Sequence, residues 1–552
     1  MKKDKIIVNI GDERIEVNRG TKLEHISVQY QDMWPAQIVA AKVNNSIREL
    51  SYTLYEDCSI QFIDMSMTDG IRIYLRSLIF IFIRACYELF PDSDVFIEHS
   101  LGNGLYCELH GQFPLNSKQV KEIENKMREI VANNEPFERL RVSKTEAERI
   151  FKDMGFCDKI EMLEFRPEDY VNLYRCGWMY DYLYGYMVPS TGYIKKFKLH
   201  FHLPGIVLLY PSKDKPDKVA EFVDSPKLFR VYRESEKWCK RIEVENVADL
   251  NNAIKQNKGG DLIRICEAHQ EKIIAQIADD ISEQRDGIRL ILIAGPSSSG
   301  KTTFAQRFRV QLMVNGLKPV SISIDNYFLN REDIPLNEDG KRDMESIDVI
   351  DIELFNEHLT QLIQGQAVQI PFYNFKTGSR EYTGKVVKID EDQPIIVEGI
   401  HGLNEKLTAM IPKSNKYKIY ISALTQLNID NHNRIPTTDT RLIRRIVRDH
   451  LFRGTSIEET LSMWPMVREG EEKNIFPYQE QADFMFNSAL IYELSVLKPY
   501  IFPLLEDVSR DSPYFTEVNR LKKFMKYFIE LEPEQIPNNS ILREFIGGSC
   551  FY

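Results

Sequence analysis

The octapeptide Gly295-Pro296-Ser297-Ser298-Ser299-Gly300-Lys301-Thr302 carries the clearest signal in this chain of 552 residues. It fits the pattern GxxxxGK[ST], which is typical of loops that bind phosphate groups. The apolar stretch 290–294 leads into the loop as a predicted strand, and 303–315 leads out as a predicted helix that ends at Asn315-Gly316. Strand, loop and helix in this order predict a nucleotide-binding α/β sheet.

The loop has the chemistry of a nucleotide phosphate site. Its glycines let backbone N–H groups converge on phosphate oxygens, and the N-terminus of the next helix adds the positive end of a dipole. Lys301 is expected to reach the β and γ phosphates, and Thr302 to hold Mg²⁺. The residues expected to bind the nucleotide here are Gly295, Pro296, Ser297, Ser298, Ser299, Gly300, Lys301, Thr302 and Thr303.

Two acidic residues end predicted strands further along the chain. Asp325 follows the strand 320–324, and Glu398 follows the strand 394–397. Because the carboxyl ends of neighbouring parallel strands face one crevice, both side chains are expected beside the loop. Asp325 is expected to accept a proton from an attacking hydroxyl or to hold Mg²⁺, and Glu398 to orient metal-bound water. A turn, a helix cap or an ordinary strand-end acid is the alternative.

An arginine-rich segment, 439–449, has the spacing of a helix. Arg441, Arg444, Arg445 and Arg448 stand at i, i+3, i+4 and i+7, so they share one helix face. Four like charges repel one another unless an anion meets them, and guanidinium groups suit phosphate oxygens. A nucleotide phosphate is the expected counter-ion; the alternative is a solvated face paired with acids of the same segment.

Composition limits the class of protein. Hydrophobic residues make up 43% and charged residues 28%, which excludes a fibrous or largely disordered chain. The net charge of −11 argues against a strongly basic nucleic-acid binder. Eight cysteines without a CxxC pair predict reduced thiols and a cytoplasmic protein. Arginines interrupt the apolar run 71–90, which predicts a buried helix and no membrane span.

The order of predicted elements gives a multidomain α/β and α+β chain. A hairpin, a helix and further strands predict a β-grasp domain at 1–65, and mixed elements an α+β domain at 66–240. The remaining predicted segments are a helical connector at 241–285, an α/β domain with a parallel sheet at 286–510 and a helical tail at 511–552.

The region 288–510 resembles the uridine kinase/phosphoribulokinase family of P-loop kinases. The matching segments are the phosphate loop, Asp325-Asn326-Tyr327-Phe328, Pro371-Phe372-Tyr373-Asn374-Phe375 with Ser379-Arg380, the strand PIIVEGIH, and DTRLIRRIVRD with Arg453-Gly454. The resemblance implies ATP, Mg²⁺ and phosphorylation of a hydroxyl on a nucleoside or similar small molecule.

The same resemblance implies roles for single residues. Asp325 matches the general base, Lys301 and Thr302 the phosphate and metal residues, and Arg441, Arg445 and Arg448 an arginine-rich lid. Tyr373 and Arg380 match positions near the nucleoside; Tyr327 and Phe375 are expected to complete that pocket. Gly378 stands where uridine kinases usually carry a histidine that helps to read the pyrimidine, which leaves the base specificity open.

The first 240 residues resemble the N-terminal part of threonyl-tRNA synthetases. Residues 1–65 resemble a TGS domain, with Lys42-Val43-Asn44 as a local match, and the next region resembles the editing-type domain, with Asn103-Gly104-Leu105-Tyr106. The metal-binding pairs of that domain fall on Phe80, Arg84, Leu183 and Met187, which predicts that this copy lacks the editing site.

Three interpretations stay open from the sequence. The first is an ATP-dependent nucleoside kinase, and its closest rival is a P-loop kinase of another small hydroxyl compound, such as a phosphosugar. The third is an RNA- or ribosome-associated NTPase switch, in which the TGS-like domain contacts RNA. A homo-oligomer is expected, and the N-terminal region has a regulatory or a purely structural role.

Overall fold

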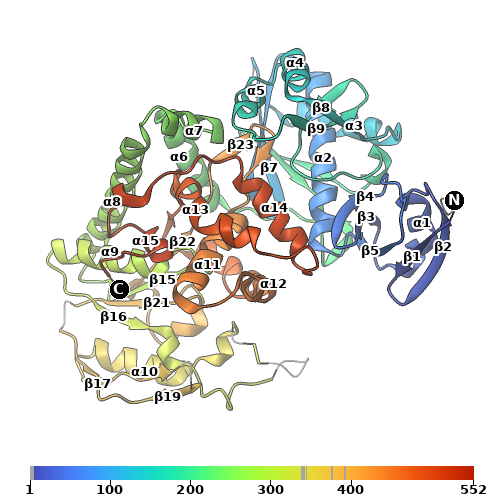
Figure 1. Cartoon of the computed structure of the whole chain (residues 1–552). Coiled ribbons are helices and arrows are strands. Elements are labelled where there is room, and N and C mark those ends of the chain that lie inside the picture. Colours follow the sequence, from blue (N-terminus) through green and yellow to red (C-terminus); the bar gives the residue numbers. More distant parts are fainter. Residues whose placement is uncertain are drawn as a thin grey trace.

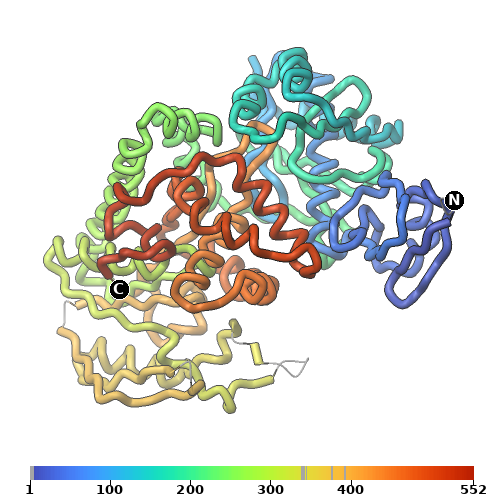
Figure 2. Tube along the Cα trace, viewed as in Figure 1, coloured from blue at the N-terminus to red at the C-terminus, as the bar shows by residue number. Residues whose placement is uncertain are grey.

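The computed structural model describes residues 5–112, 114–336, 342–343, 345–374, 377–390 and 393–551. In Figure 1 the N-terminal sheet lies at one end, a second mixed region packs beside it, and the parallel sheet with its helices forms the other side. The tube in Figure 2 shows the C-terminal segment, in red, running back across the middle of the molecule. Arg72 of the second region and Glu517 of that segment form an ion pair at 3.0 Å, which ties these distant parts together.

The N-terminal part is a five-stranded sheet with one helix across it. The strand order is β2-β1-β5-β3-β4, and β1 and β5 are parallel. The sheet closes on a core that includes Val8, Leu23 and Phe62. Its elements are β1 Lys5–Ile10, β2 Glu13–Asn18, α1 Leu23–Tyr30, β3 Ile38–Val43, β4 Ser46–Glu49 and β5 Cys58–Asp64.

The second region packs a buried helix against an antiparallel sheet. Helix α2, Thr68–Leu89, holds the apolar run and is buried along most of its length. The sheet order is β11-β12-β7-β6, and a smaller sheet has the order β10-β9-β8. The other elements are β6 Asp94–Leu101, β7 Gly104–His110, α3 Ser117–Ala132, β8 Glu138–Ser143, α4 Lys144–Met154, α5 Cys157–Glu164, β9 Tyr170–Cys176, β10 Met179–Asp181, β11 Lys198–His202 and β12 Gly205–Leu209. Within these described ranges, no helix is both long and apolar enough to cross a membrane.

A five-stranded parallel sheet carries the phosphate loop. Its order is β16-β21-β15-β22-β25, with β15 in the centre. Leu290 and Leu292 of β15 pack on one side with helix α10 (Ile352–Ile363), and Ile291 and Ile293 pack on the other with helix α9 (Lys301–Val314). Burial on both faces explains why this strand is an uninterrupted apolar run. The strands are β15 Leu290–Ala294, β16 Val320–Ser323, β21 Ile395–Glu398, β22 Lys416–Ser422 and β25 Phe484–Asn487.

Helices cover both faces of this sheet. They are α8 Gly259–Glu283, α9 Lys301–Val314, α10 Ile352–Ile363, α11 Thr437–Arg453, α12 Ile457–Asn474 and α13 Glu493–Glu506. Short strands lie beside α10: β17 Val368–Gln369, β18 Phe372–Asn374, β19 Ser379–Glu381 and β20 Val386–Val387. The multidomain α/β and α+β class predicted from the sequence is thereby confirmed.

The C-terminal segment, expected to be a helical tail at 511–552, is helical only in parts. Helix α14 spans Phe515–Met525 and ends well before the end of that tail. The side chain of Asn251 explains the early end, because it donates to the Tyr527 carbonyl at 2.7 Å and accepts from the Ile529 N–H at 2.9 Å. These tertiary hydrogen bonds take backbone groups that a longer helix would use. The short helix α15, Arg543–Ile546, then packs into the same core as the parallel sheet.

A hairpin just before α11 joins the parallel-sheet part to the second region. Strands β23, Asn428–Asp430, and β24, Asn433–Arg434, form this hairpin. Lys159 of α5 pairs with Asp430 at 2.8 Å and with Asp181 at 3.1 Å, and His432 contacts Asp181 at 2.8 Å. All four side chains are at most 2% exposed, so the two regions share a buried ionic network.

Candidate active site

The phosphate loop has the backbone shape that an anion site requires. Ser298 has φ +60° and Gly300 has φ +84°, and Gly300 directly precedes the first residue of α9. Left-handed residues that alternate with ordinary ones turn successive backbone N–H groups toward a common point. At Gly300 an added Cβ would lie 2.4 Å from Ile541 of the C-terminal segment, so glycine is needed there for space as well as for conformation.

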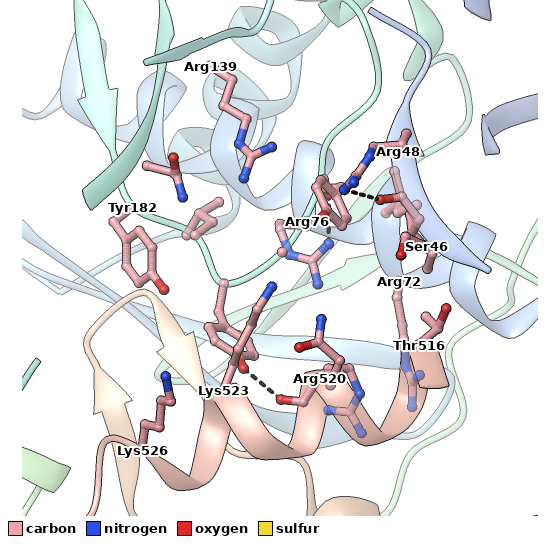
Figure 3. A pocket seen from close by; sticks show the side chains of 18 of the residues that line it. Ser46, Arg48, Arg72, Arg76, Arg139, Tyr182, Thr516, Arg520, Lys523 and Lys526 are labelled. Atoms are coloured by element: carbon pink, nitrogen blue, oxygen red, sulfur yellow. Dashed lines mark hydrogen bonds between the residues drawn. The ribbon is translucent and has the colours of Figure 1, made fainter. Parts of the chain in front are cut away.

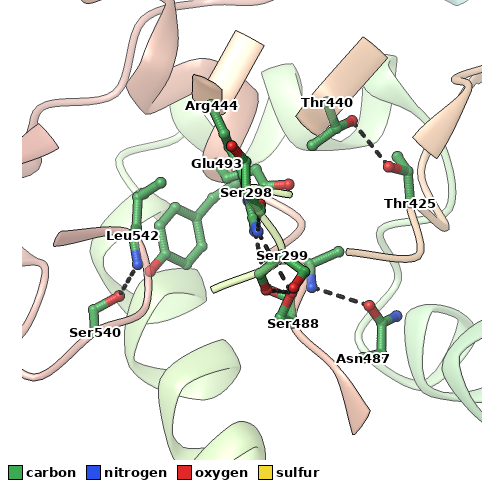
Figure 4. Close-up of polar contacts among 12 residues, drawn as sticks. Ser298, Ser299, Thr425, Thr440, Arg444, Asn487, Ser488, Glu493, Ser540 and Leu542 are labelled. Carbon is green, nitrogen blue, oxygen red and sulfur yellow. Dashed lines mark hydrogen bonds and ion pairs between the residues drawn. The ribbon is translucent and has the colours of Figure 1, made fainter. Parts of the chain in front are cut away.

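Two buried side chains donate hydrogen bonds to carbonyl groups of the phosphate loop. Ser488 Oγ donates to the Ser299 carbonyl at 2.5 Å, and Arg444 Nη1 donates to the Ser298 carbonyl at 3.3 Å. Arg444 is itself paired with Glu493, and both are buried. Figure 4 shows Arg444, Glu493 and Ser488 gathered around Ser298 and Ser299. Arg444 therefore holds the loop in place and is not presented to a ligand.

Lys301 lies among carboxylates. Its ammonium donates to the carbonyls of Gly295 at 2.8 Å and Pro296 at 3.2 Å. Burial lowers the pKa of Lys301, and the nearby charges of Glu398 and Glu544 oppose that effect. The lysine is thus folded back over its own loop, within electrostatic reach of the predicted acidic residues.

The two predicted strand-end acids are placed together at one end of the sheet. β16 and β21 are parallel neighbours, and Glu398 pairs with Ser323, two residues before Asp325. Asp325 is exposed to solvent, yet protein atoms displace enough water to raise its pKa, an effect that Lys301 opposes. Burial raises the pKa of Glu398 to about 7, with Lys301 opposing and Asp325 adding to the shift. The positive charge of Lys301 therefore acts on the pKa of both carboxyl groups.

The four arginines of α11 that the sequence analysis singled out divide into two pairs with different surroundings. Arg441 is buried, binds Glu471 through Nη2 at 2.8 Å and donates to the Ser297 carbonyl at 3.0 Å. The expectation that one anion meets all four arginines is therefore wrong for Arg441 and Arg444. Their counter-ions are glutamates of α12 and α13, which a sequence pattern within α11 does not reveal.

The other two arginines of α11 keep a positive excess beside the loop. Arg445 donates to Ser297 Oγ at 2.9 Å, and it shares the buried carboxylate of Asp449 with Arg448 and Arg453, each at 3.2 Å. One carboxylate cannot neutralise three guanidinium groups. Arg445 and Arg448 thus remain available to phosphate charge.

Two glutamates that the sequence analysis missed already bind loop N–H groups. Glu471 Oε1 accepts from the Ser297 N–H at 2.9 Å. Glu544 Oε2 accepts from the Thr303 N–H at 3.2 Å and from its hydroxyl at 2.9 Å. Carboxylate oxygens on these donors show that the loop suits anionic oxygens, which fits the phosphates of a nucleotide. Glu544 lies 241 residues from Thr303 in the chain, so no local sequence signal indicates the contact.

The residues predicted to contact an acceptor are only partly placed to do so. Tyr327 is fully buried, its hydroxyl lies 3.1 Å from His358 Nδ1, and its ring packs on Phe355. Tyr373 is 2% exposed and packs on Phe328. The expectation that these two tyrosines line an open pocket is therefore wrong, because both rings belong to the core under α10. The predicted Phe375 lies outside the described residues.

Two arginines lie close to the strands β18 and β19. Arg380 pairs with Asp351 at 2.9 Å and is partly exposed. Gly378 has φ +70°, and an added Cβ there would lie 2.9 Å from Nε of Arg331. The guanidinium of Arg331 thus lies beside the position where uridine kinases usually carry histidine.

The second region has core residues where an editing domain has metal ligands. Phe80, Leu183 and Met187 are at most 2% exposed. Arg84 forms ion pairs with Glu88 and Glu135, each at 2.8 Å. In the part of the chain that the structure describes, no group of three or more His, Cys, Asp or Glu side chains is arranged to hold a metal ion.

Comparisons with known proteins follow the division of the chain. The model of the phosphoribulokinase / uridine kinase family matches residues 290–493. The threonine–tRNA ligase of Desulforamulus reducens is 31% identical over 181 residues, which is 33% of this chain and 28% of the ligase. That of Thermotoga neapolitana is 31% identical over 202 residues, 36% of this chain and 30% of the ligase. The chain thus spans less than a third of the length of these relatives.

Solved structures with a similar part were also found. A putative fructose transport system kinase from Silicibacter sp. TM1040 is 17% identical and covers 39% of this chain and 98% of its own, with a TM-score of 0.29. A possible uridine kinase from Bacillus stearothermophilus is 17% identical and covers 36% of this chain and 89% of its own, with a TM-score of 0.25.

The segment that matches the kinase-family model holds the phosphate loop and most of the parallel sheet. The resemblance of this segment, residues 290–493, to the phosphoribulokinase / uridine kinase family was predicted from the sequence and is confirmed. The N-terminal region matches threonine–tRNA ligases, which was also predicted.

Proposed function

We propose that the protein transfers the γ-phosphoryl group of ATP to a hydroxyl of a small molecule, and that a nucleoside is the first candidate acceptor. The observation that carries this proposal is the gathering of Asp325, Glu398 and Lys301 at the carboxyl end of the sheet. A nucleotide switch needs the loop and its lysine, but it does not need a second, solvent-exposed carboxylate with a raised pKa.

In this proposal the loop residues 295–303 bind the phosphates of ATP, and Lys301 leaves the Gly295 and Pro296 carbonyls to contact the β and γ phosphates. Arg445 and Arg448 add positive charge where negative charge builds up in the transition state, and Arg441 acts by holding the Ser297 carbonyl. Thr302 and Glu398 are the proposed magnesium residues, and Mg²⁺ would neutralise phosphate charge when bound.

Asp325 is the proposed general base. Its carboxylate is exposed, so an acceptor hydroxyl can approach it, and its raised pKa makes it a better proton acceptor than an ordinary aspartate. The proton leaves the hydroxyl for the carboxylate while the hydroxyl oxygen bonds to the γ-phosphorus and the bond to ADP breaks. Asp325 thus supplies the step that distinguishes a kinase from a simple ATPase.

A second candidate acceptor is a phosphosugar, because two guanidinium groups lie near the acceptor side. The side chain of Arg331 lies beside Gly378, and Arg380 is partly exposed next to Asp351. Guanidinium forks match phosphate oxygens, whereas a nucleoside has no phosphate to meet them. Tyr327 and Tyr373 are buried in the core, so their rings do not offer the contacts with a nucleoside base that were expected from the sequence.

The test is a panel of nucleosides and phosphosugars incubated with ATP and Mg²⁺, with phosphorylated products measured by mass spectrometry. The proposal predicts a phosphorylated product that the Lys301→Ala variant does not form. ATP hydrolysis that no acceptor changes and that RNA stimulates would contradict it and favour the switch.

The Arg331→Met variant separates the two acceptor classes. If the acceptor carries a phosphate, its KM should rise by about tenfold or more, the usual value of a charge-assisted hydrogen bond. The KM for a nucleoside should stay unchanged in the same variant.

A further inference from the structure

A cavity that shares no residue with the phosphate loop lies where three parts of the chain meet. Its volume is about 460 Å³, and its lining comes from β4, helix α2, strand β8 and helix α14. Figure 3 shows the side chains of Arg48, Arg76, Arg139 and Lys523 extending into this space from its different walls. The N-terminal sheet, the second region and the C-terminal segment thus build one site together.

The lining of this cavity is strongly basic. Nine of its residues are arginine or lysine, and two are acidic. Four of the nine form ion pairs: Arg72 and Arg520 with Glu517, and Arg166 and Lys526 with Glu168. Arg520 also binds Asp439 at 2.6 Å. These four hold the walls together and are balanced by their own carboxylates.

The other five basic residues have no carboxylate within 4 Å among the described residues; they are Arg48, Arg76, Arg139, Arg510 and Lys523. Arg76 donates to the Tyr186 carbonyl at 2.7 Å, which satisfies a hydrogen bond without neutralising the charge. Nε of Arg48 is buried and has no hydrogen-bond partner in the described part of the chain. Uncompensated cations converge here although the protein as a whole carries a net charge of −11.

The surroundings make this arrangement unfavourable without a ligand. Burial lowers the pKa of Arg76 to about 10, with Arg72 and Arg520 adding to the shift. Burial also lowers the pKa of Lys523, and Arg139, Arg48 and Lys526 contribute. Glu49 also interacts with two of these cations: burial raises its pKa, whereas its hydrogen bond from Tyr174 and the charges of Arg139 and Arg76 lower it. Like charges in a partly dehydrated site repel one another, and an anion bound among them relieves this repulsion.

We propose that this cavity binds a small molecule that carries two or more phosphate groups. Four guanidinium groups and the ammonium of Lys523, all without a carboxylate partner within the ranges that the structure describes, line this one cavity, and guanidinium forks bind phosphate oxygens in pairs. A single carboxylate or phosphate would leave most of the positive charge unbalanced. The volume is that of a small-molecule site, which lies in the range of about 300–1,000 Å³, and this size favours a compact ligand over an RNA strand. The site is separate from the proposed ATP site and uses none of its residues.

The test uses inorganic pyrophosphate as the probe and isothermal titration calorimetry as the measurement. The full chain is used with Lys301→Ala, so that binding at the phosphate loop is suppressed. The proposal predicts that pyrophosphate still binds. Adding Arg139→Met and Lys523→Met, two exposed side chains of the cavity, should weaken that binding by at least about tenfold.

A matched control removes the same charges elsewhere. Arg230→Met and Lys237→Met, both exposed on helix α6 (Pro226–Arg241) and outside the cavity lining, should leave pyrophosphate binding unchanged. The cavity variant should melt at the same or a higher temperature, because like-charge repulsion is relieved. If that variant melts at a lower temperature, Arg48→Met replaces it as the test variant, with the same expected loss of pyrophosphate binding.

Two further outcomes would overturn the proposal. The first is that pyrophosphate does not bind the Lys301→Ala chain, or that it binds the cavity variant and the control variant with equal affinity. The other is a single-stranded RNA that binds through Arg139 and Lys523 while pyrophosphate does not, which would assign the surface to RNA.

Discussion

The contact of Glu544 with the phosphate loop gives a quantitative prediction for ATP binding. Glu544 occupies the Thr303 N–H at 3.2 Å and the Thr303 hydroxyl at 2.9 Å, so it must leave before phosphate oxygens use these donors. A hydrogen bond to a charged group contributes about 1.5–3 kcal/mol, and one to a neutral group about 0.5–1.5 kcal/mol. Glu544→Gln keeps the shape of the side chain and removes its charge. The competing contact should therefore weaken by roughly 1–1.5 kcal/mol, and the ATP dissociation constant should fall roughly five- to tenfold.

The assay for Glu544→Gln is calorimetric titration of the full chain with ATP and Mg²⁺. Glu534→Gln is the matched control, because Glu534 is exposed on the same C-terminal segment and the charge change is identical. Glu534→Gln should leave the ATP affinity unchanged. An unchanged or weaker affinity in Glu544→Gln would refute the argument that this carboxylate competes with phosphate.

Three other predictions concern Lys301, Glu398 and the buried ionic network around Lys159. Lys301→Ala should lower turnover by roughly 10²–10³, since it removes a donor aimed at developing charge, and circular dichroism should remain that of the wild type. Because the pKa of Glu398 is raised to about 7, the protonated carboxyl stabilises the folded state at low pH, and this stabilisation is lost as the pH rises through about 7. Glu398→Gln cannot lose this proton. Its melting temperature should therefore fall less than that of the wild type between about pH 5 and 8. Lys159→Met leaves Asp181 and Asp430 buried without their cation, which should destabilise the docked hairpin by about 3–5 kcal/mol and speed hydrogen exchange in 428–434. Exposed Lys152→Met should not change that exchange.

The strands and the loop were predictable because their signals are local. The central strand Leu290–Ala294 has the predicted bounds, since burial on both faces demands an unbroken apolar run. Asn116 directly precedes helix α3, and its side chain accepts from the N–H groups of Lys118 and Gln119, a capping signal that is equally local. A pattern over a few residues is sufficient for both features.

The remaining features depend on partners far away in the chain. Glu471 and Glu493 neutralise Arg441 and Arg444 from other helices, so the arginine pattern of α11 alone gives the wrong counter-ion. Tyr327 follows Asp325 closely in sequence, but the turn between them directs its ring into the core toward Phe355. Such choices are made by tertiary packing, and sequence spacing does not report them.

The central claim is that Asp325 takes a proton from an acceptor hydroxyl during phosphoryl transfer. The most direct measurement compares ATP affinity and acceptor phosphorylation in Asp325→Asn, which keeps the shape of the side chain and removes the proton acceptor. The account predicts an ATP affinity within a few-fold of the wild type and a loss of phosphorylation of roughly 10²–10⁴. An equal loss of both would mean that Asp325 acts through metal binding or structure, and no loss of either would remove it from the active site.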